Sequence, residues 1–218
     1  MDAAAGNGHG RVVRWLHEHR PEGCSSEAAD NAAKSGHLTI LRWLLEFRSE
    51  GCTYKAMDAA ASNGHLPVLL WLHANKDVGC STEAMDGAAA GGHLEIIKWL
   101  HVNRTEGCTK GAMDRASAAG HLQVVQWLHL HRREGCTTAA MDGAAKNGRF
   151  EVLLFLHFTR SEGCSPAAAV GASQNEHLEV LQWLFHHYPQ HIQHDQVIVF
   201  AKRNNVYLMD WLHRRVAA

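Results

Sequence analysis

The sequence has no apolar run of 18 residues, so it predicts no membrane-spanning helix. Its first residues show no basic cluster followed by an apolar segment. We therefore expect no secretion signal and a cytoplasmic protein whose thiols stay reduced. An excess of charge is also missing, because 21 Lys and Arg residues face 22 Asp and Glu residues among 218. Nucleic acids and anionic membranes are therefore not expected partners.

The common catalytic signatures are missing too. The chain contains no Gly-Lys-Ser/Thr phosphate loop, no His-Glu-x-x-His zinc motif and no Gly-x-Ser-x-Gly nucleophile turn. A row of repeated side chains offers no single pocket where a nucleophile and a base converge. We expect no enzymatic activity and no cofactor.

What the sequence does contain is a fixed period of 28 residues, for example from Cys24 to Cys52. Cysteine recurs at this interval up to Cys164, and tryptophan keeps the same interval from Trp15 to Trp127. Such a period predicts stacked structural repeats. We expect one array over residues 1–218 with about eight units. The first unit is incomplete, and the last is a divergent C-terminal cap in which Ile192 replaces the cysteine.

Each repeat reads as a hairpin of two short helices. In residues 135–159, Thr137 supplies a helix-capping hydroxyl, and small residues predict a first helix over 138–146. Asn147-Gly148 ends that helix, and a second, more apolar helix begins near Phe150. Helices this short are unstable alone. The predicted fold is therefore all-α, a solenoid of stacked antiparallel helix pairs.

The cysteines are expected to be free. Equivalent positions on neighbouring packed helices lie about 8–10 Å apart, whereas a disulfide needs Cα atoms within about 7 Å. We expect each thiol to fill a small apolar site.

Residues 88–100 and 116–128 resemble the middle of an ankyrin repeat, with two small residues, Gly-His-Leu and then an apolar helix. The resemblance implies an α-solenoid that binds proteins, usually on its concave face. The period of 28 residues is shorter than the roughly 33 of the family. The short segment 104–108 stands where ankyrin repeats carry a β-hairpin finger. The chain therefore resembles a divergent subclass with Trp-Leu-His and Glu-Gly-Cys signatures and with reduced or absent fingers.

Two further sets of repeated residues are predicted to be structural. The tryptophans should pack between repeats, and they are Trp43, Trp71, Trp99, Trp127 and Trp183. The aspartates should be at least half buried and hydrogen-bonded, and they are Asp30, Asp58, Asp86, Asp114 and Asp142. The expected partners of the aspartates are backbone N–H groups or the basic residues Arg20, Arg48, Lys76, Arg104, Arg132 and Arg160.

Histidine also recurs, in the Gly-His turns and at the end of each Trp-Leu-His segment. By the resemblance, the turn histidines are structural hydrogen-bonding residues. A row spaced by one repeat cannot place three or four ligands on one ion. The weak metal candidates are His187, His191 and His194, and Pro189 interrupts this group. Buried neutral histidines would also make the stack sensitive to acid.

One face of the first helix changes between repeats, and the resemblance identifies it as the concave face. Its positions are four and three residues apart, like Glu27, Asn31 and Lys34. The candidate partner-binding residues are Asn31, Lys34, Lys55, Glu83, Gly87, Arg115, Gly143, Lys146 and Gln174. The glycines on this face have two open explanations, close approach by another backbone or neutral drift.

The sequence thus predicts a monomeric, non-enzymatic scaffold that binds a protein partner. The alternatives are a histidine-rich module that responds to metal or pH, and a fragment of a longer ankyrin-repeat protein.

Overall fold

The computed structural model describes all residues except 77, 202–208 and 213–218. Its contacts divide the chain into two compact units, Met1–Thr109 and Lys110–Ala218, and each unit is described by itself. The prediction of one array of about eight repeats with a C-terminal cap therefore stays a prediction. The expected end of the last helix, at Arg214 and Arg215, lies outside the described residues.

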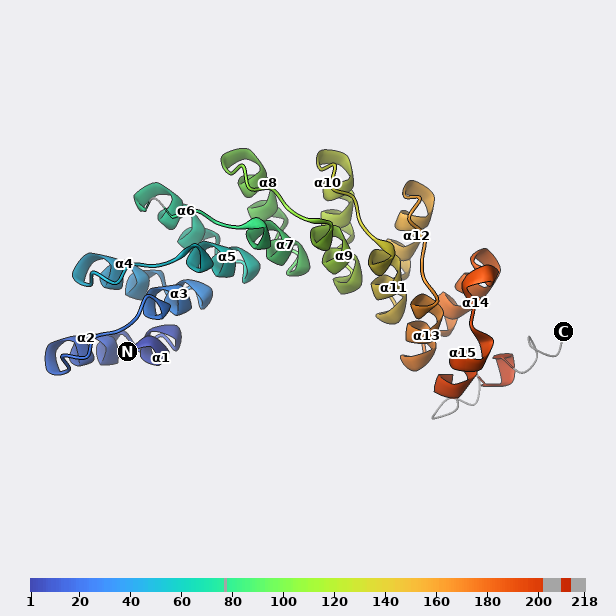
Figure 1. The fold of residues 1–218 in the computed structure, drawn as a ribbon, viewed down its shortest axis with the longest axis horizontal. Helices are drawn as coiled ribbons and strands as arrows, with labels where there is room; N and C mark the ends of the chain where they lie inside the picture. The colour runs from blue at the N-terminus through green and yellow to red at the C-terminus, as the bar shows by residue number, and fades with distance from the viewer. Residues whose placement is uncertain (77, 202–208, 213–218) are drawn as a thin grey trace. The chain divides into compact units, whose positions relative to one another are not determined.

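The first unit consists of four helical hairpins. Their helices are α1 (Asp2–Gly6), α2 (Gly10–His19), α3 (Glu27–Lys34), α4 (Leu38–Phe47), α5 (Tyr54–Ser62), α6 (Leu66–Asn75), α7 (Thr82–Ala90) and α8 (Leu94–Asn103). The first helices of the hairpins, α1, α3, α5 and α7, pack side by side in one row (Figure 1). Each second helix packs against the first helix of its own hairpin.

The second unit repeats this arrangement. Its helices are α9 (Lys110–Ala119), α10 (Leu122–His131), α11 (Thr138–Lys146), α12 (Phe150–Thr159), α13 (Ala167–Gln174), α14 (Leu178–His187), the 3₁₀ turn η1 (Pro189–His191) and α15 (His194–Ala201). Helices α9, α11, α13 and α15 form the row of first helices. For the repeat of residues 135–159, the sequence predicted a first helix over 138–146 and a second helix from residue 150. These bounds are those of α11 and α12.

The all-α prediction is confirmed, since the described residues contain no β-strand. The described residues that join one hairpin to the next lie in short loops without strands, so they form no β-hairpin finger. From Gly8 to Gly148, the turn within each hairpin is closed by a glycine in the left-handed region, such as Gly64 with a φ of 79°. In the hairpin of α13 and α14, Glu176 takes this place with a φ of 61°. Side chains from the next repeat pack against these glycines, because a Cβ added to Gly64 would lie 2.7 Å from the ring of His93.

Alanine dominates the first helices because the row needs close helix contacts. Ala28, Ala32, Ala56 and Ala60 are almost completely buried between neighbours. The second helices contribute larger core residues, each worth about 1.5–3 kcal/mol on burial, and these include Leu41, Leu69, Ile97, Leu128, Leu153 and Leu181. The repeated tryptophans are only half-buried, at Trp43, Trp71, Trp99, Trp127 and Trp183.

The predicted hydroxyl caps are present. The Oγ atoms of Thr53, Ser81 and Thr137 each accept a hydrogen bond from the backbone N–H two residues further on. Ser25 and Ser165 accept the same bond, although their helices begin one residue later than expected. Each cap satisfies one orphan N–H group at the start of a first helix.

Candidate functional site

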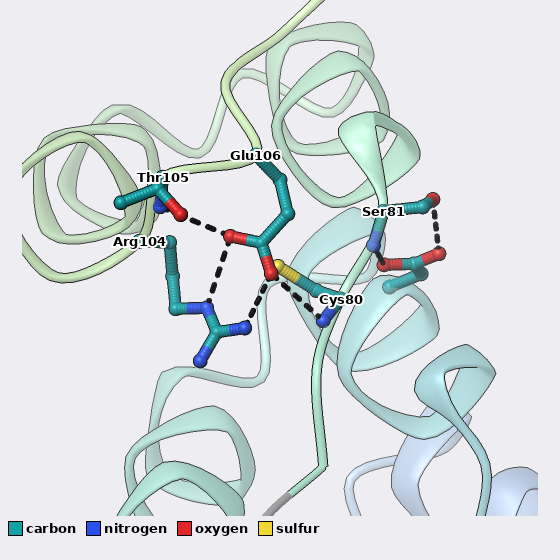
Figure 2. Close-up of polar contacts among 6 residues, drawn as sticks. Cys80, Ser81, Arg104, Thr105 and Glu106 are labelled. Carbon is teal, nitrogen blue, oxygen red and sulfur yellow. Dashed lines mark hydrogen bonds and ion pairs between the residues drawn. The ribbon is translucent and has the colours of Figure 1, made fainter.

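The repeated aspartates connect each first helix to the start of the next one. Asp58 accepts two hydrogen bonds from Ser81, one from its backbone N–H at 2.8 Å and one from its Oγ at 2.6 Å (Figure 2, at Ser81). The same Oγ accepts the capping bond from Glu83 N–H. We call this set the aspartate ladder, and its pairs are Asp2–Ser25, Asp30–Thr53, Asp58–Ser81, Asp86–Thr109, Asp114–Thr137 and Asp142–Ser165.

The prediction that basic residues pair with these aspartates is wrong. Arg48, Arg104, Arg132 and Arg160 instead form ion pairs with the glutamate two residues further along their own loop. A capping hydroxyl and a backbone N–H lie at hydrogen-bonding distance from each aspartate, and they satisfy the carboxylate without a countercharge. Burial raises the pKa of Asp142, and the bonds from Ser165 oppose this shift.

The arginine–glutamate pair forms a bridge between successive loops, shown in Figure 2. Glu106 Oε2 accepts hydrogen bonds from Arg104 Nε at 3.2 Å and from the backbone N–H of Thr105 at 3.0 Å. Glu106 Oε1 accepts a bond from the backbone N–H of Cys80, in the preceding loop, at 3.3 Å. We call this contact the loop bridge, and Arg160 and Glu162 form the corresponding one with the backbone of Cys136. It joins neighbouring repeats at the place where a β-hairpin finger was expected to be reduced.

All six cysteines are free, as predicted. Burial raises the pKa of Cys52, Cys80 and Cys136 to about 11. A thiol rather than a thiolate is therefore present near neutral pH, and thiols are poor nucleophiles and poor metal ligands. The cysteines act as small packing residues that are half-buried or buried.

The histidines that end the Trp-Leu-His segments pack against the next repeat. The ring of His73 meets the ring of Trp99 edge-on, with centroids 5.0 Å apart, and His17 meets Trp43 at 5.1 Å. His157 contacts Trp183 in the same way, and burial lowers its pKa. These contacts give the second set of histidines a packing role between repeats. The hydrogen-bonding role of the turn histidines stays a prediction.

The C-terminal histidines have aromatic and backbone partners. His187 stacks on Trp183 with centroids 4.2 Å apart, and its Nδ1 donates to the carbonyl oxygen of Trp183 at 2.9 Å. His194 meets Phe185 edge-on. Within the part of the chain that the structure describes, no three or more His, Cys, Asp or Glu side chains are grouped to hold a metal ion. His187, His191 and His194 therefore form no metal site there.

The main candidate site is a groove of about 700 Å³ over α3, α5 and α7. It is lined by Glu27, Asp30, Asn31, Lys34, Tyr54, Lys55, Asp58, Ala59, Ser62, Asn63, Ser81 and Glu83. Asn31, Lys34, Lys55 and Glu83 were predicted as partner-binding residues from their variability alone, and the structure brings these four together. The buried carboxylates of Asp30 and Asp58 form part of the wall, where the aspartate ladder already satisfies them.

Tyr54 is a lining residue that the repeat pattern did not indicate. It is 53% exposed at the first position of α5, where the other repeats have Ser26, Thr82, Lys110, Thr138 and Pro166. An aromatic residue at a position that is otherwise small or polar was the available signal.

The candidate glycines need a correction. Gly87 is buried, and a Cβ added to it would lie 1.9 Å from the Oγ of Ser62 on α5. A Cβ added to Gly143 would lie 2.7 Å from the Cβ of Ala118 on α9. The close approach is therefore made by the preceding helix of this chain. The buried Gly87 is not part of the exposed surface, whereas the participation of the half-buried Gly143 in partner binding stays a prediction.

The remaining candidates lie in the second unit. Arg115, Lys146 and Gln174 are exposed on α9, α11 and α13. Their participation in binding stays a prediction. No helix in the described part of the chain has the length and apolar character to cross a bilayer.

Comparisons with known proteins agree with this architecture. The crystal structure of the human ASB11 ankyrin repeat domain is similar, with a TM-score of 0.61 and 15% sequence identity. The match covers 86% of this chain and 96% of that domain. At this identity the likeness shows the fold alone. No curated protein sequence matches the chain significantly. The model of ankyrin repeats in many copies matches residues 1–45, 29–73 and 85–129, which together make up more than half of the sequence. The chain belongs to the ankyrin-repeat family.

Proposed function

We propose that this chain is a non-enzymatic scaffold that binds a protein partner on the face of its first helices, at the groove over α3, α5 and α7. Ankyrin repeats are generally protein–protein interaction modules. The observation that carries the assignment to this face is the groove itself, because its lining gathers residues that differ between repeats while the packing residues recur.

The chemistry of the groove fits a macromolecular partner better than a reaction. Its ionisable side chains are either exposed, as Lys34 and Lys55 are, or already hydrogen-bonded, as Asp30 and Asp58 are. No nucleophile and base face each other among these lining residues. We also propose that the chain is a cytoplasmic monomer and that it binds neither nucleic acids nor membranes.

The test compares two charge-altered variants in capture from native lysate, followed by quantitative mass spectrometry. The double variant Asn31→Arg/Lys55→Glu changes the groove. The control Glu95→Lys/Lys98→Glu exchanges an exposed ion pair on α8. We expect a partner that wild type and control retain and the groove variant loses. Equal capture by all three proteins would remove the groove from the proposal.

A further inference from the structure

Charges of alternating sign follow the groove from one helix to the next. Glu27, Lys55 and Glu83 occupy the same position in three successive repeats, at the starts of α3, α5 and α7, and all three are exposed. They line one groove. The corresponding position in the second unit has Gly111, Ala139 and Ala167, none of which is charged. The alternation is therefore a property of the groove and not of the repeat.

The first two of these charges, Glu27 and Lys55, do not pair with each other. Among the residues that the structure describes, Glu27 and Lys55 take part in no ion pair, although their helices are neighbours. Two exposed charges that form no ion pair stay available to a ligand. A partner with the complementary order of signs gains attraction at each position and a fixed register along the groove.

The spacing of the row selects one backbone conformation of the partner. Neighbouring packed helices lie about 8–10 Å apart. A polyproline II segment advances about 9 Å in three residues and returns every third side chain to the same side. In a β-strand, side chains three residues apart point to opposite faces. An extended chain crossing α3, α5 and α7 can therefore meet all three charges only if it is close to polyproline II.

Two other lining residues suit such a segment. The amide of Asn31 makes no hydrogen bond to another described residue, so it offers one donor and one acceptor group. Polyproline II has no internal hydrogen bonds, and its N–H and C=O groups are free to pair with that amide. The exposed ring of Tyr54 offers a flat apolar surface, the kind on which proline-rich segments dock.

We propose that the groove binds a polyproline II segment of a protein partner with basic, acidic and basic side chains at positions i, i+3 and i+6, opposite Glu27, Lys55 and Glu83. This inference rests on the proposed function and adds the chemistry of the ligand.

The direct test uses two synthetic peptides and fluorescence anisotropy at low salt. The matched peptide is Arg-Pro-Ala-Glu-Pro-Ala-Arg, and the inverted peptide is Glu-Pro-Ala-Arg-Pro-Ala-Glu. Each exposed ion pair is worth up to about fivefold in affinity, so we expect wild type to prefer the matched peptide by roughly tenfold. The variant Glu27→Lys/Lys55→Glu/Glu83→Lys should reverse this preference. Equal binding of both peptides, or a preference unchanged in the variant, overturns the inference.

Circular dichroism melting checks that the triple variant is folded. If it is not, the single variant Lys55→Glu takes its place. It should weaken the preference for the matched peptide without abolishing it, because Glu27 and Glu83 still face the two arginines.

A peptide display library separates failure of this inference from failure of the proposed function. Random peptides are selected on wild type and then tested against Asn31→Arg/Lys55→Glu. Peptides that depend on the groove and carry the predicted order of charges support the inference. Groove-dependent peptides without that order overturn the inference and leave the proposed function standing. Absence of any groove-dependent peptide counts against both.

Discussion

At the scale of single residues, one carboxylate and one hydroxyl connect two helices. Asp86 is 2% exposed, and it accepts hydrogen bonds from both the backbone N–H and the Oγ of Thr109. A buried carboxylate is tolerated only when such donors replace water. The aspartate ladder therefore both caps and aligns the first helices.

We expect Asp86→Ala to lower the free energy of unfolding by about 2–4 kcal/mol, because it removes two bonds to a charged acceptor and leaves their donors unsatisfied. Urea denaturation at pH 7 measures this. Asp86→Asn is the matched variant, and it should lose less because its amide oxygen can still accept the backbone bond. The exposed Glu151→Ala is the control and should change little. An Asp86→Ala variant as stable as wild type would contradict a structural role for the ladder.

The loop bridges predict a contribution to stability that depends on pH. The hydrogen bond from Arg160 holds the pKa of Glu162 at about 2, below its ordinary value of 4.5. Because the folded pKa is the lower one, the bridge stabilises the native state above about pH 4.5 and loses this effect as the pH falls towards 2.

The variant Glu162→Gln should therefore be less stable than wild type at pH 6, and the difference should shrink between pH 4.5 and 2. Urea midpoints across this range measure it. Glu151→Gln, a change at an exposed carboxylate, serves as the control. A difference for Glu162→Gln that stays constant down to pH 2 would be inconsistent with the bridge.

At the scale of helices, the distance between neighbouring first helices depends on the size of the side chains at a few contact positions. Gly143 faces Ala118, and any Cβ at residue 143 would collide with a side chain that has no torsion to relieve the contact. Glycine normally weakens a helix by about 1 kcal/mol relative to alanine. Here it is required by packing between α9 and α11.

Gly143→Ala should lower the free energy of unfolding by about 1–2 kcal/mol, since overpacking outweighs the gain in helix propensity. The exchange Gly143→Ala/Ala118→Gly keeps the number of Cβ atoms at the contact and should return stability close to that of wild type. Chemical denaturation of both variants decides the point. Stabilisation by Gly143→Ala alone is the result that this packing forbids.

At the scale of the whole molecule, stability comes from contacts between successive hairpins. Each first helix packs on the neighbouring first helices of its unit, and in the described part of the chain each helix is ten residues or shorter. Helices of this length are not stable alone in water. Such a stack should accept removal of one complete repeat but not of half a repeat.

Deletion of residues 54–81, one period in the first unit, places Thr53 directly before Thr82 and keeps the capping hydroxyl and its bond to Asp30. We expect a folded protein with the same helicity per residue and a urea m-value lower by roughly one eighth. Deletion of residues 54–67 removes half a period, destroys the register and should abolish cooperative unfolding. If both deletions behave alike, stacking in register is not what maintains the fold.

The period of 28 residues was enough to predict the hairpins and the caps, because these depend on residues close in sequence. It also predicted the free cysteines, because equivalent positions on packed helices lie too far apart for a disulfide. The bounds of α11 and α12 and the capping role of Thr137 follow from Thr, Gly and Leu positions within one repeat. The variable positions on the first helices also indicated Asn31, Lys34, Lys55 and Glu83, which lie together in one groove.

Only the tertiary structure decided which repeated group pairs with which. Asp58 and Ser81 are 23 residues apart, and the sequence offers arginine and hydroxyl partners with equal regularity. The choice depends on how far one helix is shifted along the next, which is set by side-chain packing across the row. The packed helices also place Gly87 against Ser62 and leave Tyr54 exposed. A period shows which residues are equivalent, but the distances between side chains of different repeats are fixed only when the helices pack.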